Sequence, residues 1–250
     1  EIRARFREEL DYSLEAQRQL RFARLFRTDP QVHVPLIHQK LSTSRVMTSE
    51  WVEGMNFDDA CAQPEALRTQ WCETLWHFVY KASLVGGLFN ADPHPGNYIF
   101  HPEGRVSFFD FGCVQEFATP RRLAAQAVHR AARNADQTAF NEAARALFGF
   151  VGGAYEPRAL AYLEACFQPL WRSPFRITRP YVADLVKMMK ALVADFRKPA
   201  KDGYVPLPPQ TFFFNRLQFG FYSVLARLDC EVDYTRVERL FLDEDTDTVP

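Results

Sequence analysis

The order of apolar and polar positions predicts one helix and two short strands in the first 53 residues. Between residues 2 and 26, apolar side chains recur about every 3.6 residues and are separated by charged ones, which predicts an amphipathic helix. Two prolines follow this helix. The apolar runs over 32–37 and 45–52 then predict two short strands joined around Ser42-Thr43-Ser44, and Gly54 breaks the chain.

A long apolar segment and a hairpin come next. Residues 64–89 predict a helix that opens at Pro64 and closes in Gly86-Gly87. Residues 90–97 are rich in turn formers and predict a loop. Short strands over 98–100 and 106–109, on either side of Glu103-Gly104, predict a β-hairpin that ends at Asp110.

The second half of the chain has a helical pattern from Pro120 to Leu240. Its breaks lie at 152–153, 173–174, 178–180 and 201–209, and residues 243–250 form an acidic tail. The pattern as a whole predicts an α+β, predominantly helical fold.

Residues 212–222 are dense in aromatic side chains. An apolar stripe at helical spacing normally faces a core, so a core helix is the favoured interpretation. The alternative is a membrane-surface or isoprenoid-binding face, which aromatic amphipathic helices also provide.

Composition narrows the class of protein. The chain has 250 residues, of which 47% are hydrophobic and 24% charged, and this excludes disordered and collagenous proteins. A formal net charge of -1 creates no field that would gather nucleic acid. Five scattered cysteines without a CxxC pair argue against a disulfide framework or structural zinc.

His77 and Lys81 interrupt the most apolar segment, so no membrane span is predicted. We therefore expect a cytoplasmic protein.

The candidate chemistry lies in the loop and hairpin. Asp92 is followed five residues later by Asn97, and the next hairpin delivers Asp110-Phe111-Gly112. This is the order of groups used in protein-kinase-type phosphoryl transfer. Magnesium prefers the oxygen ligands that Asn97 and Asp110 offer, while Asp92, held off the metal, can orient the attacking hydroxyl or water and accept its proton.

Other interpretations of these residues exist. Asp92, His94 and Asp110 are also compatible with a hydrolase-type metal cluster, although no second histidine stands at ligand spacing. Isolated glutamates on the first helix are most simply a solvated acidic face. Glu50-Trp51-Val52 is a weak signal for a segment that binds a flat base.

Five segments together resemble the UbiB/AarF atypical kinase-like family, and a weaker resemblance continues over 207–228. They are Glu-Leu-Asp-Tyr-Ser-Leu-Glu-Ala (9–16), Val-Pro (34–35), Ser-Thr-Ser-Arg-Val-Met-Thr-Ser-Glu-Trp-Val-Glu-Gly (42–54), Ala-Asp-Pro-His-Pro-Gly-Asn (91–97) and Phe-Asp-Phe-Gly (109–112). The run over 91–97 is the specific one.

The resemblance implies a protein-kinase-like fold, with residues 1–53 as the remnant of the small lobe and 54–250 as the large helical lobe. It also implies binding of ATP and magnesium, and a role in isoprenoid quinone biosynthesis or lipid metabolism. The partners it suggests are an isoprenoid lipid, quinone-biosynthesis proteins and the surface of the inner membrane.

The resemblance also implies a role for each matching residue. Asp92 matches the catalytic-loop aspartate, Asn97 and Asp110 the metal ligands, Glu15 the glutamate that pairs with a phosphate-binding lysine, Glu9 and Asp11 the Glu-x-Asp motif, and Glu50, Trp51 and Val52 the nucleotide-binding hinge.

Two departures from the family pattern affect the expected activity. Asn90 stands where the family often has histidine, and no lysine precedes Lys40, so Glu15 lacks the expected partner. We therefore expect this chain alone to bind ATP poorly or not at all, because positioning and charge neutralisation of the phosphates are most of what such enzymes supply. Two alternatives remain open: a non-catalytic platform for a lipid or partner, and a phosphotransferase of the aminoglycoside- or choline-kinase type.

Overall fold

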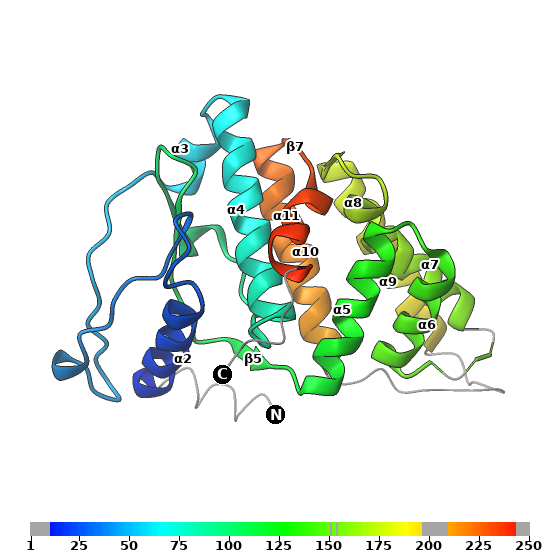
Figure 1. Ribbon diagram of the computed structural model, residues 1–250, viewed down its shortest axis with the longest axis horizontal. Helices are drawn as coiled ribbons and strands as arrows, with labels where there is room; N and C mark the ends of the chain where they lie inside the picture. Colours follow the sequence, from blue (N-terminus) through cyan, green and yellow to red (C-terminus); the bar gives the residue numbers. More distant parts are fainter. Residues whose placement is uncertain (1–10, 151, 154, 197–209, 244–250) are drawn as a thin grey trace.

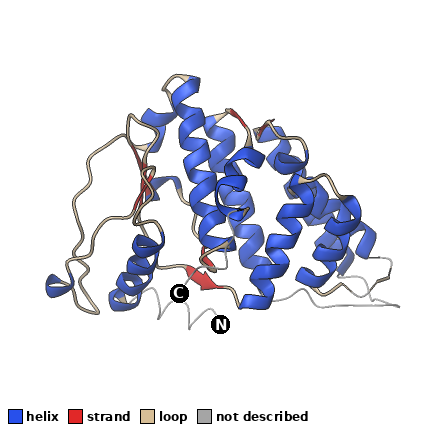
Figure 2. Cartoon of the chain, in the orientation of Figure 1, coloured by secondary structure: helices blue, strands red, loops and turns tan. Residues whose placement is uncertain are grey.

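The computed structural model describes residues 11–150, 152–153, 155–196 and 210–243 (Figure 1). Helix α2 (Tyr12–Leu25) and the long extended segment after it lie at one end, the helices over 119–196 lie at the other, and the last two helices lie between them. Helices predominate, and the strands form one three-stranded and two two-stranded sheets among the described residues (Figure 2). This confirms the α+β, predominantly helical fold.

Helix α2 begins where a side chain can cap it. The Asp11 carboxylate accepts a hydrogen bond from the Ser13 backbone N–H at 3.0 Å, which satisfies one of the unpaired donors of the first turn. The first part of the predicted helix, before Asp11, lies outside the described residues. Phe22 from its buried face and Phe26, directly after its last residue, pack against Phe78 of the central helix α4, with ring centroids 5.5 and 5.1 Å away.

The predicted strand over 45–52 is wrong. β1 is confined to Val32–His33, and a short 3₁₀ helix, η1 (Gln39–Leu41), follows it. Residues 42–52 make only isolated bridges, such as Ile37 with Ser49, instead of a continuous ladder. Without a neighbouring strand to pair with, an apolar run has no reason to extend regularly.

Helix α4 (Glu65–Leu84) runs through the middle of the molecule and follows the short α3 (Phe57–Cys61). Pro64 precedes it, as predicted, but the helix ends five residues earlier than the predicted end at Phe89. Gly87 has a positive φ of 63°, which turns the chain out of the helix. Residues Leu88–Asn90 then form strand β2, which pairs antiparallel with β5 (Val114–Glu116).

The predicted hairpin is confirmed. β3 (Tyr98–Phe100) pairs antiparallel with β4 (Val106–Phe108), and β1 joins β4 in parallel. Gly104 takes the positive φ, 74°, that the turn requires. Two side chains of helix α4 bind the turn of this hairpin. The Thr74 hydroxyl donates a hydrogen bond to the Gly104 carbonyl at 2.8 Å, and the Trp71 indole N–H donates one to the His101 carbonyl at 2.9 Å.

The remaining helices complete the body of the molecule. They are α5 (Thr119–Arg133), α6 (Gln137–Phe148), α7 (Glu156–Cys166), α8 (Gln168–Trp171), α9 (Arg179–Phe196), α10 (Gln210–Leu228) and α11 (Tyr234–Leu242), with strands β6 (Phe175–Arg176) and β7 (Glu231–Val232) paired between them. Within the described residues, no helix has both the length and the apolar character that a bilayer crossing requires.

The aromatic segment predicted over 212–222 lies within α10. Phe221 and Tyr222 are buried, each with its ring centroid 6.1 Å from that of Trp76, so the described part of this segment belongs to the core. The side chains of 210–218 lie outside the described residues.

One continuous hydrophobic core includes both Phe22 and Leu242, so α2 and the helical body are packed together.

Candidate functional site

The loop between β2 and β3 holds Asp92 in place through backbone hydrogen bonds. The Asp92 N–H donates to the Asn90 side-chain oxygen at 3.2 Å, and the Asn97 side-chain N–H donates to the Asp92 carbonyl at 3.3 Å. The loop closes in the single 3₁₀ turn η2 (Pro95–Asn97). Helix α10 supports it from behind, because a Cβ added at Gly220 would lie 2.7 Å from the Pro93 ring.

Asp110 follows β4 and has an unusual backbone. Its φ is 59°, in the left-handed region that aspartate adopts more readily than most side chains. The Asp110 carboxylate accepts the Gly112 N–H at 3.1 Å, and the residue before Asp110, Phe109, donates its N–H to the Asn97 carbonyl at 2.9 Å. The strand end that bears Asp110 is therefore tied to the loop that bears Asp92.

Asn90 connects the two loops most directly. Its side-chain N–H donates to the Asp110 carbonyl at 2.9 Å, while its side-chain oxygen accepts from the Asp92 N–H. The sequence marked Asn90 only as a departure from histidine. The sequence did contain a signal for this role. Asn90 stands at the end of a strand, two residues before the candidate catalytic aspartate, and a side-chain amide can donate and accept hydrogen bonds at the same time.

Helix α2 holds the Asp-Phe-Gly segment from the other side. Glu15 accepts a hydrogen bond from the Phe111 backbone N–H, and Arg18 donates to the Gly112 carbonyl at 2.6 Å. Phe22 packs on Phe111 with ring centroids 4.8 Å apart. Burial raises the pKa of Glu15, the nearby Asp110 carboxylate raises it further, and the Phe111 N–H and Arg18 oppose both. Glu15 thus lies beside Asp110 and is tied to the backbone of the segment that carries it.

These groups surround one cavity of about 820 Å³. Its lining combines three carboxylates from separate segments with polar and apolar side chains and one basic side chain. The lining residues are Tyr12, Glu15, Gln19, Arg45, Val46, Met47, Ser49, Asp92, Phe109, Asp110, Gly112 and Cys113. Asn97 does not line the cavity, but its side-chain N–H binds the backbone carbonyl of Asp92, which does.

The predicted hinge lies next to this cavity without lining it. Ser49 is a lining residue, but Glu50 accepts from the Leu36 N–H at 3.2 Å, and its carboxylate lies 3.3 Å from the His33 ring. Trp51 is 84% exposed. Asp11 caps α2, and Glu9 lies outside the described residues.

The donor set suits magnesium better than a histidine-rich metal site. Asp92, Asp110 and Asn97 supply oxygen atoms, which magnesium prefers. Among the described residues, no three His, Cys, Asp or Glu side chains gather closely enough to hold a metal ion. His94 instead accepts the Gly96 N–H on its ring nitrogen at 3.1 Å. The alternative cluster of Asp92, His94 and Asp110 is therefore wrong.

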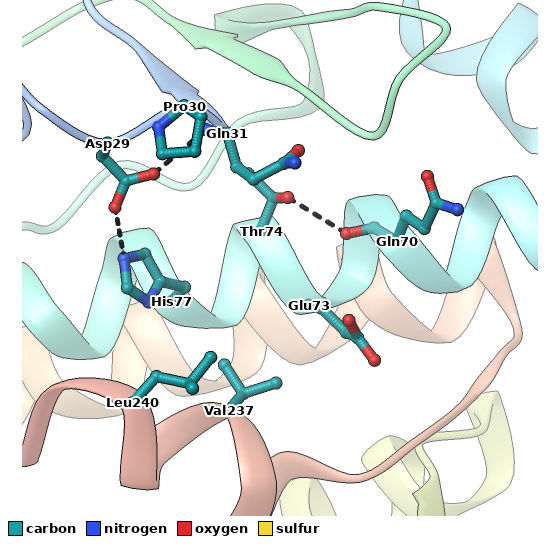
Figure 3. A pocket seen from close by; sticks show the side chains of 9 residues that line it. All are labelled: Asp29, Pro30, Gln31, Gln70, Glu73, Thr74, His77, Val237 and Leu240. Carbon is teal, nitrogen blue, oxygen red and sulfur yellow. Dashed lines mark hydrogen bonds and ion pairs between the residues drawn. The ribbon is translucent and has the colours of Figure 1, made fainter. Parts of the chain in front are cut away.

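A smaller cavity of about 310 Å³ lies between α4, α11 and the segment after α2 (Figure 3). It shares no lining residue with the first cavity. Asp29 lies 2.6 Å from the His77 ring and 3.5 Å from the Lys81 ammonium group. Burial alone would raise the pKa of Asp29, but His77, the Gln31 N–H and Lys81 together lower it. Asp29 is thus paired with His77 and Lys81, Glu73 pairs with Arg236, and none of the site residues predicted from the sequence lines this cavity.

The sequence is similar to a family of atypical kinase-like proteins. The ABC1 atypical kinase-like domain matches residues 1–144. The chain is 35% identical over 113 residues to an Arabidopsis thaliana chloroplast protein named Activity of bc1 complex kinase 1, and the match covers 43% of this chain and 16% of that protein. An uncharacterized Synechocystis protein is 34% identical over 143 residues, covering 56% of this chain and 21% of the relative.

The fold has a counterpart among solved structures. The chain resembles the Mycobacterium tuberculosis protein Rv3197, solved in complex with erythromycin, with a TM-score of 0.67 and 22% identity. The similarity covers 94% of this chain and 58% of that one. The aligned segments thus span about a fifth of the length of the curated relatives. The domain match covers more than half of the sequence, and the chain belongs to the ABC1 atypical kinase-like family, the group that includes UbiB/AarF-type proteins.

Proposed function

We propose that the larger cavity binds magnesium-ATP and that the protein is an atypical kinase or ATPase. The observation that carries the proposal is the convergence of Glu15, Asp92 and Asp110, from three separate segments, on one cavity of about 820 Å³. Hydrogen bonds through Asn90 and Asn97 hold the two aspartates in a fixed relation. Catalysis of phosphoryl transfer depends mainly on such positioning and on electrostatic stabilisation.

Each residue has a distinct role in the proposal. The Asp92 carboxylate orients the attacking hydroxyl or water and accepts its proton. Asp110, with Asn97 from the loop that carries Asp92, would hold magnesium, which would neutralise charge on the phosphates when bound. Glu15 and Arg18 fix the Asp-Phe-Gly backbone.

The hinge and the first helix complete the nucleotide site in this proposal. The backbone of Glu50, Trp51 and Val52 contacts the base. Glu9 and Asp11 contribute the family's Glu-x-Asp motif.

The proposed physiological role is in isoprenoid quinone biosynthesis or lipid metabolism. Its support is membership of the ABC1 family together with the UbiB/AarF-type motifs over 9–16 and 91–97. The proposed acceptor is a small molecule or water, and the proposed location is the cytoplasm, at the surface of the inner membrane. The small lobe is assigned to residues 1–53 and the helical lobe to 54–250.

Three matched aspartate-to-asparagine variants test the site. Asp110→Asn removes a metal ligand, so we expect magnesium-dependent ATP binding in a chemical-shift titration to be lost. Asp92→Asn should retain binding and lower phosphate release by about 10²- to 10⁴-fold. Asp184→Asn, on an exposed ion pair with Lys187, is the control and should change neither.

Two other outcomes are informative. Unchanged magnesium-ATP binding by Asp110→Asn would contradict the site assignment. Binding without any phosphate release from the wild-type chain would favour the non-catalytic platform over the enzyme.

A further inference from the structure

The charge of the larger cavity is unfavourable for its proposed ligand. Its lining includes the three carboxylates of Glu15, Asp92 and Asp110, and a polyphosphate is itself strongly negative. A single magnesium ion leaves part of that charge uncompensated. Among the described lining residues one side chain is basic, and it is Arg45.

Arg45 is presented by a well-defined turn over residues 43–46. The Thr43 N–H donates to the Val46 carbonyl at 2.7 Å, and the Thr43 hydroxyl accepts from the backbone N–H groups of Arg45 and Val46, at 3.2 Å each. The Tyr12 N–H donates to the Ser44 carbonyl at 3.1 Å, which attaches the turn to the start of α2. The position of Arg45 is therefore linked to the helix that bears Glu15.

Among the described residues, the Arg45 guanidinium group has no hydrogen-bond or ion-pair partner. The residue is exposed and lines the cavity. Two arginines of α2 differ in this respect, since Arg18 binds the Gly112 carbonyl and Arg21 pairs with Glu116. A planar guanidinium offers paired donors that match phosphate oxygens.

We propose that Arg45 binds the phosphate chain of the nucleotide and gives the cavity its preference for polyphosphates over the bare nucleoside. This inference rests on the proposed function and adds a binding residue to which the family resemblance assigns no role. It assigns to Arg45 part of the charge neutralisation that a polyphosphate needs beside the three lining carboxylates.

The test compares Arg45→Ala, Arg45→Lys and the control Arg105→Ala, which removes an exposed arginine from the β3–β4 turn. Magnesium-ATP, magnesium-tripolyphosphate and adenosine are titrated against each variant. Loss of one charge-assisted contact should weaken ATP and tripolyphosphate binding by about 10- to 150-fold in Arg45→Ala. Adenosine affinity should not change, Arg45→Lys should be intermediate, and Arg105→Ala should match the wild type.

The outcomes separate this inference from the proposed function. If wild type binds magnesium-ATP and Arg45→Ala binds it equally well, the role of Arg45 is refuted and the nucleotide site stands. If wild type binds neither ATP nor tripolyphosphate, both proposals fail. Because Arg45 is exposed, its variants should retain the wild-type Tm, and a lowered ATP affinity in a variant with an unchanged Tm reports a lost contact.

Discussion

Asn90 provides a quantitative test of how the site is held together. Its side chain donates to the Asp110 carbonyl at 2.9 Å and accepts from the Asp92 N–H at 3.2 Å. A neutral hydrogen bond contributes about 0.5–1.5 kcal/mol net, so Asn90→Ala removes about 1–3 kcal/mol of positioning energy. If that energy is needed in the transition state, ATP turnover should fall by about 5- to 150-fold.

Two further variants show whether the effect is positional. Asn90→Asp keeps the acceptor for Asp92 but places a carboxylate oxygen against the Asp110 carbonyl, so it should be at least as impaired as Asn90→Ala. Asn90→His can donate and accept while neutral, but once protonated both ring nitrogens donate and the acceptor is lost. Its turnover should therefore fall below about pH 6.5 relative to wild type.

The assay is magnesium-dependent phosphate release from pH 5.5 to 8, with Tm measured alongside. Unchanged turnover in Asn90→Ala would refute the positioning role. So would a pH profile of Asn90→His that overlays the wild-type profile.

Three other predictions concern packing and charge. Gly220→Ala should reduce turnover while unfolding stays cooperative, since the new methyl group would lie 2.7 Å from Pro93 in the catalytic loop; unchanged turnover would show that the loop adapts. Glu238 is fully buried and binds the Trp76 indole and the His129 ring, so Glu238→Ala should cost about 3–5 kcal/mol in urea unfolding, and a loss under 1 kcal/mol would contradict this. Asp29 has a lowered pKa, so its stabilising contribution is present above about pH 3.9 and is lost as the pH falls through the folded-state value. The free energy of unfolding lost in Asp29→Asn should hence shrink as the pH falls toward 3; a pH-independent difference would count against the Asp29–His77 interaction.

Local signals in the sequence predicted the parts of the fold that depend on nearby residues. The hairpin around Gly104 and the loop over 91–97 follow from prolines, glycines and short apolar runs that act within a few residues. The long α4 helix was predicted for the same reason. The end of α4 was not, because strand β2 exists only through its pairing with residues 114–116, more than twenty positions away.

Two features of the site also depended on distant contacts. The hydrogen bond between Glu15 and the Phe111 backbone joins residues almost a hundred positions apart, so no local pattern predicts it. The local sequence does not indicate that the 43–46 turn is attached to the start of α2, so it does not predict that Arg45 lines the cavity. Residue types identified the two aspartates, and tertiary packing determined which other groups accompany them.

The most direct test of the nucleotide site replaces magnesium with paramagnetic manganese. Manganese-ATP added to the ¹⁵N-labelled chain should broaden the amide signals around Asp92, Asn97 and Asp110, and Asp110→Asn should abolish that broadening. Broadening centred on the smaller cavity beside Asp29 and His77, or none at all at saturating nucleotide, would contradict the assignment of the larger cavity as the ATP site.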